Sequence, residues 1–165
     1  MPQSASPMPA RLTVALAAID AANAADPTLE EGRPAALLYV ERMRAELARL
    51  VPDASDLLRI AARGQHVERW LLPRSDYPQG KEGYLAWRRE HGRRHADRVA
   101  GIMAEAGYDA ADCIRIGALL RKEGIKRDAE VQTLEDVACL VFLRWHFADF
   151  AAKHPAEEID RIVSK

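Results

Sequence analysis

The chain has 165 residues, 48% of them hydrophobic, and its 24 lysines and arginines nearly balance its 25 aspartates and glutamates. This length and composition predict a single globular domain with a sizeable core. The net charge of −1 provides no global field that would favour a nucleic acid or an anionic membrane as partner. Two cysteines are too few for a disulfide framework or a cysteine-rich zinc cluster.

The N-terminus and the apolar runs bear on the compartment. The first residues, MPQSASPMPA, lack the regions of a secretory signal, so we expect a disordered tail over residues 1–9 and one helical domain over residues 10–165. The longest fully apolar run, residues 137–143, is much shorter than the ~20 residues that span a bilayer. The sequence therefore predicts a cytoplasmic protein without membrane contact, and it leaves the oligomeric state open.

Helical patterns follow one another along the chain, and no segment alternates as a strand would. A first helix is expected over about residues 10–24 and a second from Pro34 to about residue 50. A third is expected over about residues 54–72. The proline- and glycine-rich stretch that follows predicts a long, functional loop before the next helix.

The second half continues the same pattern. The fourth and longest helix is expected over residues 84–107, and the fifth from about Asp109, a plausible N-cap, to Lys122. The sixth is expected over about residues 129–153, and a short last helix from Pro155 to the end. The prediction is thus an all-α, single-domain bundle of about seven helices.

The expected sixth helix is apolar almost all round over residues 137–150. Helices of this kind are usually central and covered on every side. Substituting Leu140 by alanine is therefore expected to cost about 2–5 kcal/mol through a cavity. Asp136 opens this apolar stretch, and because a buried carboxylate is costly without a partner, it is expected to be paired.

Two partners for Asp136 are considered. One is a cation such as Lys122, Arg98 or Arg144. The other is a metal ion shared with His66 and His95, since imidazole and carboxylate ligands suit zinc, iron and manganese.

Basic and aromatic residues gather before and within the fourth helix, where residues 59–98 hold ten Lys or Arg against five Asp or Glu. A solvated face and an anion-binding surface explain this equally well. Arg74 could fork onto a phosphate or carboxylate. Tyr77, Tyr84 and Trp87 flank the loop and could pack or stack on a base or ring. His91 is interpreted as a surface or rim residue.

Helical spacing is expected to align the candidate side chains in two stripes. The first holds Arg63, His66, Arg69 and Trp70, and the second holds Arg88, His91, His95 and Arg98.

Nearly the whole chain, including ARGQHVERWLLPRSDYP, GYLAWR, HADRV and KRDAEVQTLEDVACLVFL, resembles the helical family called domain of unknown function 4202. The resemblance brings no established activity. It implies that the chain is a shortened form, because the family usually continues past the equivalent of Lys165. The matching positions include Gln65, His66, Trp70, Pro73, Arg74, Tyr77, Pro78, Tyr84, Trp87, Arg88, His95, Glu135 and Asp136.

Residues 95–143 are also similar to the HD-domain metal-dependent phosphohydrolases, whose ligands are a His, a His-Asp pair and an Asp. His95 matches the first ligand and Asp136 the last. Where ALLHDIGK is typical, this chain has ALLRKEGIK, which places Arg121 and Lys122 at the His-Asp pair. Two cations cannot ligate a metal at neutral pH.

These resemblances imply a helical, HD-like fold with a modified pocket, and two functions are expected from it. The first is a metal-assisted hydrolase for a small anionic, nucleotide-like or phosphorylated substrate. One divalent ion, Zn, Mn or Fe, would be held by His66, His95 and Asp136, with Glu135 as a further catalytic residue.

The alternative is a non-catalytic binding or regulatory module for an anionic ligand or a protein partner. In it, the charges of Arg121 and Lys122 take the metal's place. A nucleic acid remains the weaker candidate as partner. The ligand-binding residues expected in either case are Gln65, Arg69, Arg74, Tyr77, Trp87, Arg88, Arg121 and Lys122.

Overall fold

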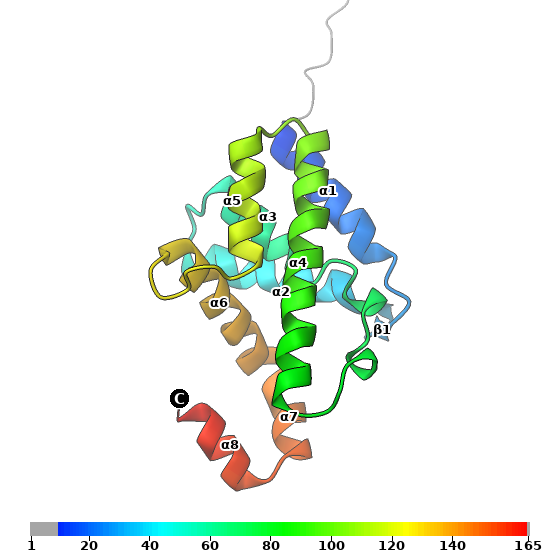
Figure 1. Cartoon of the computed structure of the whole chain (residues 1–165), viewed down its shortest axis with the longest axis vertical. Coiled ribbons are helices and arrows are strands. Elements are labelled where there is room, and N and C mark those ends of the chain that lie inside the picture. The colour runs from blue at the N-terminus through cyan, green and yellow to red at the C-terminus, as the bar shows by residue number, and fades with distance from the viewer. Residues whose placement is uncertain (1–9, 165) are drawn as a thin grey trace, which may run out of the picture.

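The computed structural model describes residues 10–164 (Figure 1), so the tail expected over residues 1–9 lies outside the described residues. The expectation of an all-α fold is confirmed, with eight α-helices in this range instead of about seven. They are α1 (Arg11–Ala24), α2 (Ala35–Leu50), α3 (Asp56–Gly64), α4 (Lys81–Glu105), α5 (Ala110–Leu120), α6 (Ala129–Val141), α7 (Phe147–Lys153) and α8 (Ala156–Val163).

Side-chain caps start three of these helices where the sequence has a short polar residue. Ser55 accepts a hydrogen bond from the backbone N–H of Leu58 at the start of α3. Asp109 and Asp128 do the same for α5 and α6. Each cap satisfies backbone donors that the first helical turn leaves open, so the boundaries of these helices follow from local chemistry.

A small β-hairpin precedes α2, and the sequence analysis did not expect it. Its strands, β1 (Leu29–Glu30) and β2 (Arg33–Pro34), pair antiparallel. Glu31 and Gly32 join them with positive φ angles of 53° and 73°, as tight hairpin turns require. With two residues per strand, no alternation is present in the sequence to reveal it.

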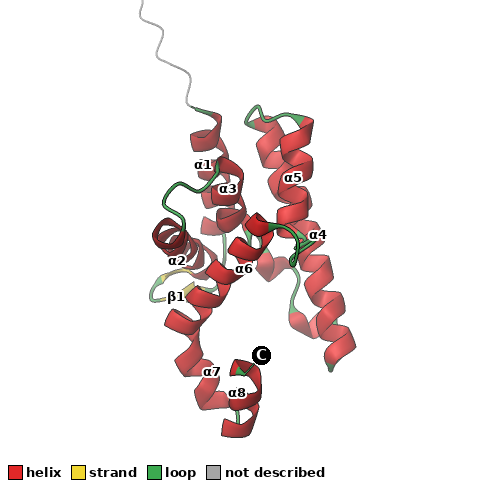
Figure 2. Cartoon of the chain, turned by 90° about the vertical axis from the view of Figure 1, so that its left-hand side faces the viewer, coloured by secondary structure: helices red, strands yellow, loops and turns green. Residues whose placement is uncertain are grey.

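The core lies between the first six helices, and α4 and α5 run side by side (Figures 1 and 2). Gly64 at the end of α3 allows a close approach to α4, because a Cβ there would collide with the side chain of Val99. The fully buried side chains include Ile19, Met43, Ile60, Val99, Met103, Ile116, Leu119, Val131, Leu134 and Val137.

The third helix is shorter than expected. It ends at Gly64, and Glu68 takes a left-handed conformation with φ of 54° before a 3₁₀ turn at Arg69–Leu71. Residues 65–72 are therefore not on an α-helix. The expected helical stripe from Arg63 to Trp70 is wrong, because the left-handed residue changes the chain direction.

The sixth helix is shorter as well. It ends at Val141, and a π-helical turn (Phe142–His146) leads into α7. Leu140, Leu143 and Trp145 are 37%, 54% and 49% exposed, so this part of the chain is not a covered, central helix. Beyond it, α7 and α8 form an arm that leaves the helical body (Figures 1 and 2).

Candidate anion-binding cleft

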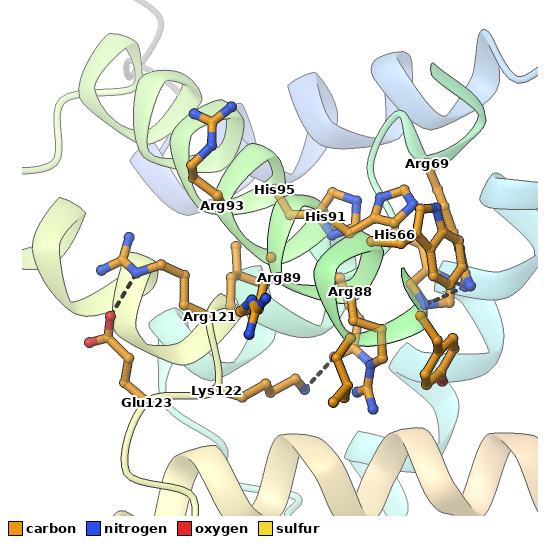
Figure 3. A pocket seen from close by; sticks show the side chains of 16 residues that line it. His66, Arg69, Arg88, Arg89, His91, Arg93, His95, Arg121, Lys122 and Glu123 are labelled. Carbon is orange, nitrogen blue, oxygen red and sulfur yellow. Dashed lines mark hydrogen bonds and ion pairs between the residues drawn. The ribbon is translucent and has the colours of Figure 1, made fainter. Parts of the chain in front are cut away.

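A cleft of about 690 Å³ opens between α4, the segment after α3 and the turn after α5 (Figure 3). Its size lies within the roughly 300–1,000 Å³ typical of small-molecule sites. Sixteen residues line it, six of them Arg or Lys and one acidic. Eight of the residues singled out in the sequence lie here: Gln65, His66, Arg69, Trp87, Arg88, His95, Arg121 and Lys122.

One face of α4 supplies Trp87, His91 and His95, because a spacing of four residues places them in line. All three are buried. The Trp87 and His91 rings meet edge to face with centroids 4.7 Å apart, and the His91 and His95 centroids are 5.2 Å apart. Within residues 10–164, the buried Nε2 atoms of both histidines have no hydrogen-bond partner. The two histidines therefore retain unused hydrogen-bonding capacity. Trp87, His91 and His95 are called the aromatic row below.

His66 and Arg69 form the wall next to α3. The His66 ring stacks on Tyr39 of α2 with centroids 3.9 Å apart, and its centroid lies 6.4 Å from that of His95. One guanidinium nitrogen of Arg69 is 3.0 Å from His66 Nε2, and the guanidinium carbon is 5.0 Å from the Trp87 ring centroid. A ring stack and a cation–π contact, rather than helical spacing, fix the positions of His66 and Arg69.

The three imidazoles are neutral at neutral pH. Burial lowers the pKa of His95 to about 3 and that of His91 to about 4, and the charge of Arg69 contributes to both shifts. Burial, followed by the charge of Arg69, also holds the pKa of His66 well below its usual value. A neutral imidazole has one donor and one acceptor nitrogen. The histidines therefore offer hydrogen bonds without adding charge.

The arginines around the cleft carry positive charge that the protein only partly neutralises. Arg93 and Arg121 form ion pairs with surface carboxylates. Within residues 10–164, Arg69, Arg88 and Arg89 form no ion pair. These three guanidinium groups, called the arginine trio below, present forks of N–H donors that suit a phosphate or carboxylate.

Lys122 extends from the turn after α5 toward α3 and α6. Its backbone is left-handed, with φ of 59°, and its ammonium group lies 3.0 Å from Gln65 Oε1 and 3.2 Å from Glu135 Oε2. Burial lowers the pKa of Lys122, and the charge of Glu135 opposes this effect. Glu135 is not a lining residue, so its link with the cleft is through Lys122.

The proline-rich loop before α4 is held by its own side chains. One guanidinium nitrogen of Arg74 donates to the carbonyl oxygens of Tyr77 and Pro78, at 3.1 and 2.9 Å. The indole N–H of Trp87 donates to the carbonyl of Leu72 at 2.9 Å and ties the loop to α4. Arg74 and Tyr77 do not line the cleft. The position of Arg74 indicates that it shapes the loop.

Asp136 also lies outside the cleft. It is on the exposed face of α6, where its carboxylate accepts a hydrogen bond from Gln132 Nε2 at 2.8 Å. The expectation that Asp136 is buried is wrong, because the inward face of α6 carries Val131, Leu134 and Val137 and leaves residue 136 on the opposite side.

The metal site expected from His66, His95 and Asp136 does not fit this geometry. The two histidine rings are neighbours in the cleft, but the carboxylate of Asp136 is exposed and does not line the cleft with them. In the part of the chain that the structure describes, no group of three or more His, Cys, Asp or Glu side chains is arranged to hold a metal ion. We therefore assign no reaction step to a metal.

Several lining residues are not predicted from the sequence, and His91 is the most informative of them. It was expected at the surface or rim, yet it is only 7% exposed. A signal was present, because His91 lies four residues from both Trp87 and His95, which had been selected as candidates. The other missed polar lining residues are Arg89, Arg93 and Glu123.

A family model described as Domain of unknown function (DUF4202) matches residues 13–165. No curated protein and no solved structure matches the chain. Among the described helices, none is both long and apolar enough to span a membrane. Because the family match covers nearly the whole sequence, the chain belongs to the DUF4202 family.

Proposed function

We propose that the cleft binds a small ligand carrying a phosphate or carboxylate group, and that the protein is a binding module for it. The observation that carries this proposal is the arginine trio of Arg69, Arg88 and Arg89, which lines one concave surface without forming ion pairs within residues 10–164. Such a surface concentrates anions and can hold an oxyanion through several N–H donors.

The aromatic row supports the same function. The open Nε2 atoms of His91 and His95 can exchange hydrogen bonds with ligand oxygens, and their neutral state avoids repulsion with the arginines. Arg121 and Lys122, which the HD-like resemblance aligns with a metal-binding His-Asp pair, line this cleft. Their position favours the alternative in which cations replace the metal.

Hydrolysis of the bound ligand is a second candidate. It is favoured by His95, whose neutral ring and open Nε2 could accept a proton from an attacking water inside the cleft. A pKa of about 3 makes His95 a weak base at neutral pH, so binding without hydrolysis is the better supported function. Release of inorganic phosphate during the titration described next would establish the hydrolase.

Isothermal titration with pyrophosphate tests the binding function. We expect the wild type to bind it and the double variant Arg88→Gln/Arg89→Gln to bind it at least about tenfold more weakly. Hydrogen bonds to charged groups contribute ~1.5–3 kcal/mol each, and exposure to solvent reduces this value. Raising the salt concentration is expected to weaken binding to the wild type more than to the variant.

The matched control is Arg44→Gln on α2. Arg44 is exposed and does not line the cleft, so its replacement removes one positive charge without touching the site. Affinity for pyrophosphate should change little in this variant. Equal weakening by the control and the double variant would show that the whole surface attracts the anion, and it would overturn the assignment to the cleft.

A further inference from the structure

A second cavity of about 340 Å³ adjoins the cleft, because His66 and Arg69 line both. Its other walls come from the start of α2, the end of α6 and the π-helical turn. Arg69 is exposed and sits on a short 3₁₀ turn. Its guanidinium group can therefore contact a ligand that extends from one cavity into the other.

Small and aromatic side chains shape the second cavity. Ala35, Ala36 and Ala138 occupy little of the space beside the rings of Tyr39 and Phe142. Flat groups pack well against aromatic rings, and bases of any kind stack on them because each has a π-face. The shape therefore suits a planar ring better than a second anion.

The polar atoms of this cavity favour a ring that contains heteroatoms. Both carboxylate oxygens of Asp26 already accept backbone N–H groups, and Glu30 is paired with Arg42 at 2.9 Å. The Nε2 atom of His146, in contrast, is buried and has no hydrogen-bond partner within residues 10–164. A buried polar atom without a partner destabilises the fold unless a ligand or water forms a hydrogen bond with it. A nitrogen or oxygen of the ring could do so.

We propose that the cleft and the second cavity form one site for a phosphorylated compound that carries a heteroaromatic ring, such as a nucleoside phosphate. The phosphate lies at the arginine trio and the ring lies beside Tyr39 and Phe142, within reach of His146. This inference rests on the proposed anion binding and adds the chemical class of the ligand.

The test compares ligands that share a phosphate and differ in the ring. Affinities of ribose 5-phosphate and of the 5′-monophosphates of adenosine, guanosine, cytidine and uridine are measured by isothermal titration. We expect at least one nucleotide to bind at least about tenfold more tightly than ribose 5-phosphate, because the stacking of one base contributes about this much affinity. The substitution Ala138→Phe fills the second cavity and should abolish this preference while ribose 5-phosphate binds as before.

The matched control is Ala48→Phe, which adds the same ring at a different cavity, next to α1 and α3. It should leave the preference intact. His146→Leu, which removes the open Nε2 atom without adding a ring, is expected to reduce the preference several-fold and serves if Ala138→Phe does not fold. If no nucleotide binds more tightly than ribose 5-phosphate, the inference is overturned and the anion site stands. If none of the phosphates binds, the proposed function falls as well.

Discussion

Burial of His91 and His95, like that of His66, makes the folded protein less stable in acid. Their pKa values of about 4 and about 3 lie below the usual value of roughly 6.5. Between about pH 6.5 and 4, the unfolded chain binds protons that the folded chain does not. The folded protein therefore keeps its full free energy of unfolding above this pH range, and this free energy decreases as the pH falls through the range. We expect the urea midpoint to fall between pH 7 and 5, and to fall less in His91→Gln/His95→Gln.

Ion-paired carboxylates do not account for the loss of stability that is expected between pH 7 and 5. The strongest ion pairs hold the pKa values of Glu90 and Asp128 near 2, so the stability that these groups contribute is lost mainly below pH 5. The matched control is His154→Gln, at the end of α7 and outside the cleft, which should follow the wild type. If the double variant loses as much stability as the wild type, the two histidines are not the groups that titrate.

Residue type and spacing identified much of the cleft lining but not how the side chains meet. Trp87 and His95 are both candidates from the sequence, and their separation of eight residues on one helix is sufficient to place His91 between them. The contact of His66 with His95 depends on a non-helical segment, which no spacing rule contains. Asp136 is expected in the site because the apolar run after it suggests burial, although the buried side chains of α6, such as Leu134 and Val137, lie on the opposite side of the helix.

At the level of elements, the sequence predicted helices best where a cap or a breaker marks the end. Asp109 was recognised as the N-cap of α5, and its side chain accepts from Asp112 N at 2.9 Å. The end of α3 was missed because it depends on the left-handed backbone of Glu68. Non-glycine residues seldom adopt that conformation, so local preference does not predict it.

The position of α6 leads to a prediction about two leucines on one helix. Leu134 is fully buried, whereas Leu140 is 37% exposed. We expect Leu134→Ala to lower the free energy of unfolding by about 2–5 kcal/mol, because it leaves a cavity in a packed core. Leu140→Ala should cost much less, because solvent already reaches its side chain. Chemical denaturation of both variants measures the difference.

Leu140→Ala is also the control for helix propensity, since both substitutions place alanine in the same helix. Similar losses from the two variants would mean that the exposed side of α6 is covered in solution. This pair replaces the expectation that Leu140 fills a central core. A completely apolar stretch shows that burial is favourable, but it does not show which neighbours are present to provide it.

At the scale of the molecule, the net charge of −1 conceals an uneven distribution. Many carboxylates are used in ion pairs away from the cleft, as when Arg115 contacts both Asp128 and Glu130. The arginine trio is left without such partners within residues 10–164, so a nearly neutral protein has a cationic cavity. Total charge therefore describes the average field of a protein and does not predict a local binding site.

The C-terminal arm is the part of the fold least attached to the body. The π-helical turn is held to α2 by Arg144, whose guanidinium Nε lies 2.5 Å from Glu46, and by Arg42 over the Trp145 ring. No residue of α8 is buried, and among the described elements none makes extensive contact with α8. In both views α8 lies apart from the helical body (Figures 1 and 2).

Removal of residues 155–165 is therefore expected to leave the body and the cleft intact. The melting temperature, followed by circular dichroism, should change by less than ~2 °C, since ~1 kcal/mol corresponds to about 2–4 °C for a chain of this size. Pyrophosphate affinity should be unchanged, because none of residues 155–164 lines the cleft. The control is a chain ended before Phe142, which also removes the π-helical turn and its contacts with α2, and it should melt clearly lower. A large loss from the shorter deletion would show that α8 packs against the body in solution, and the exposed apolar side chains of the arm would then be part of the core.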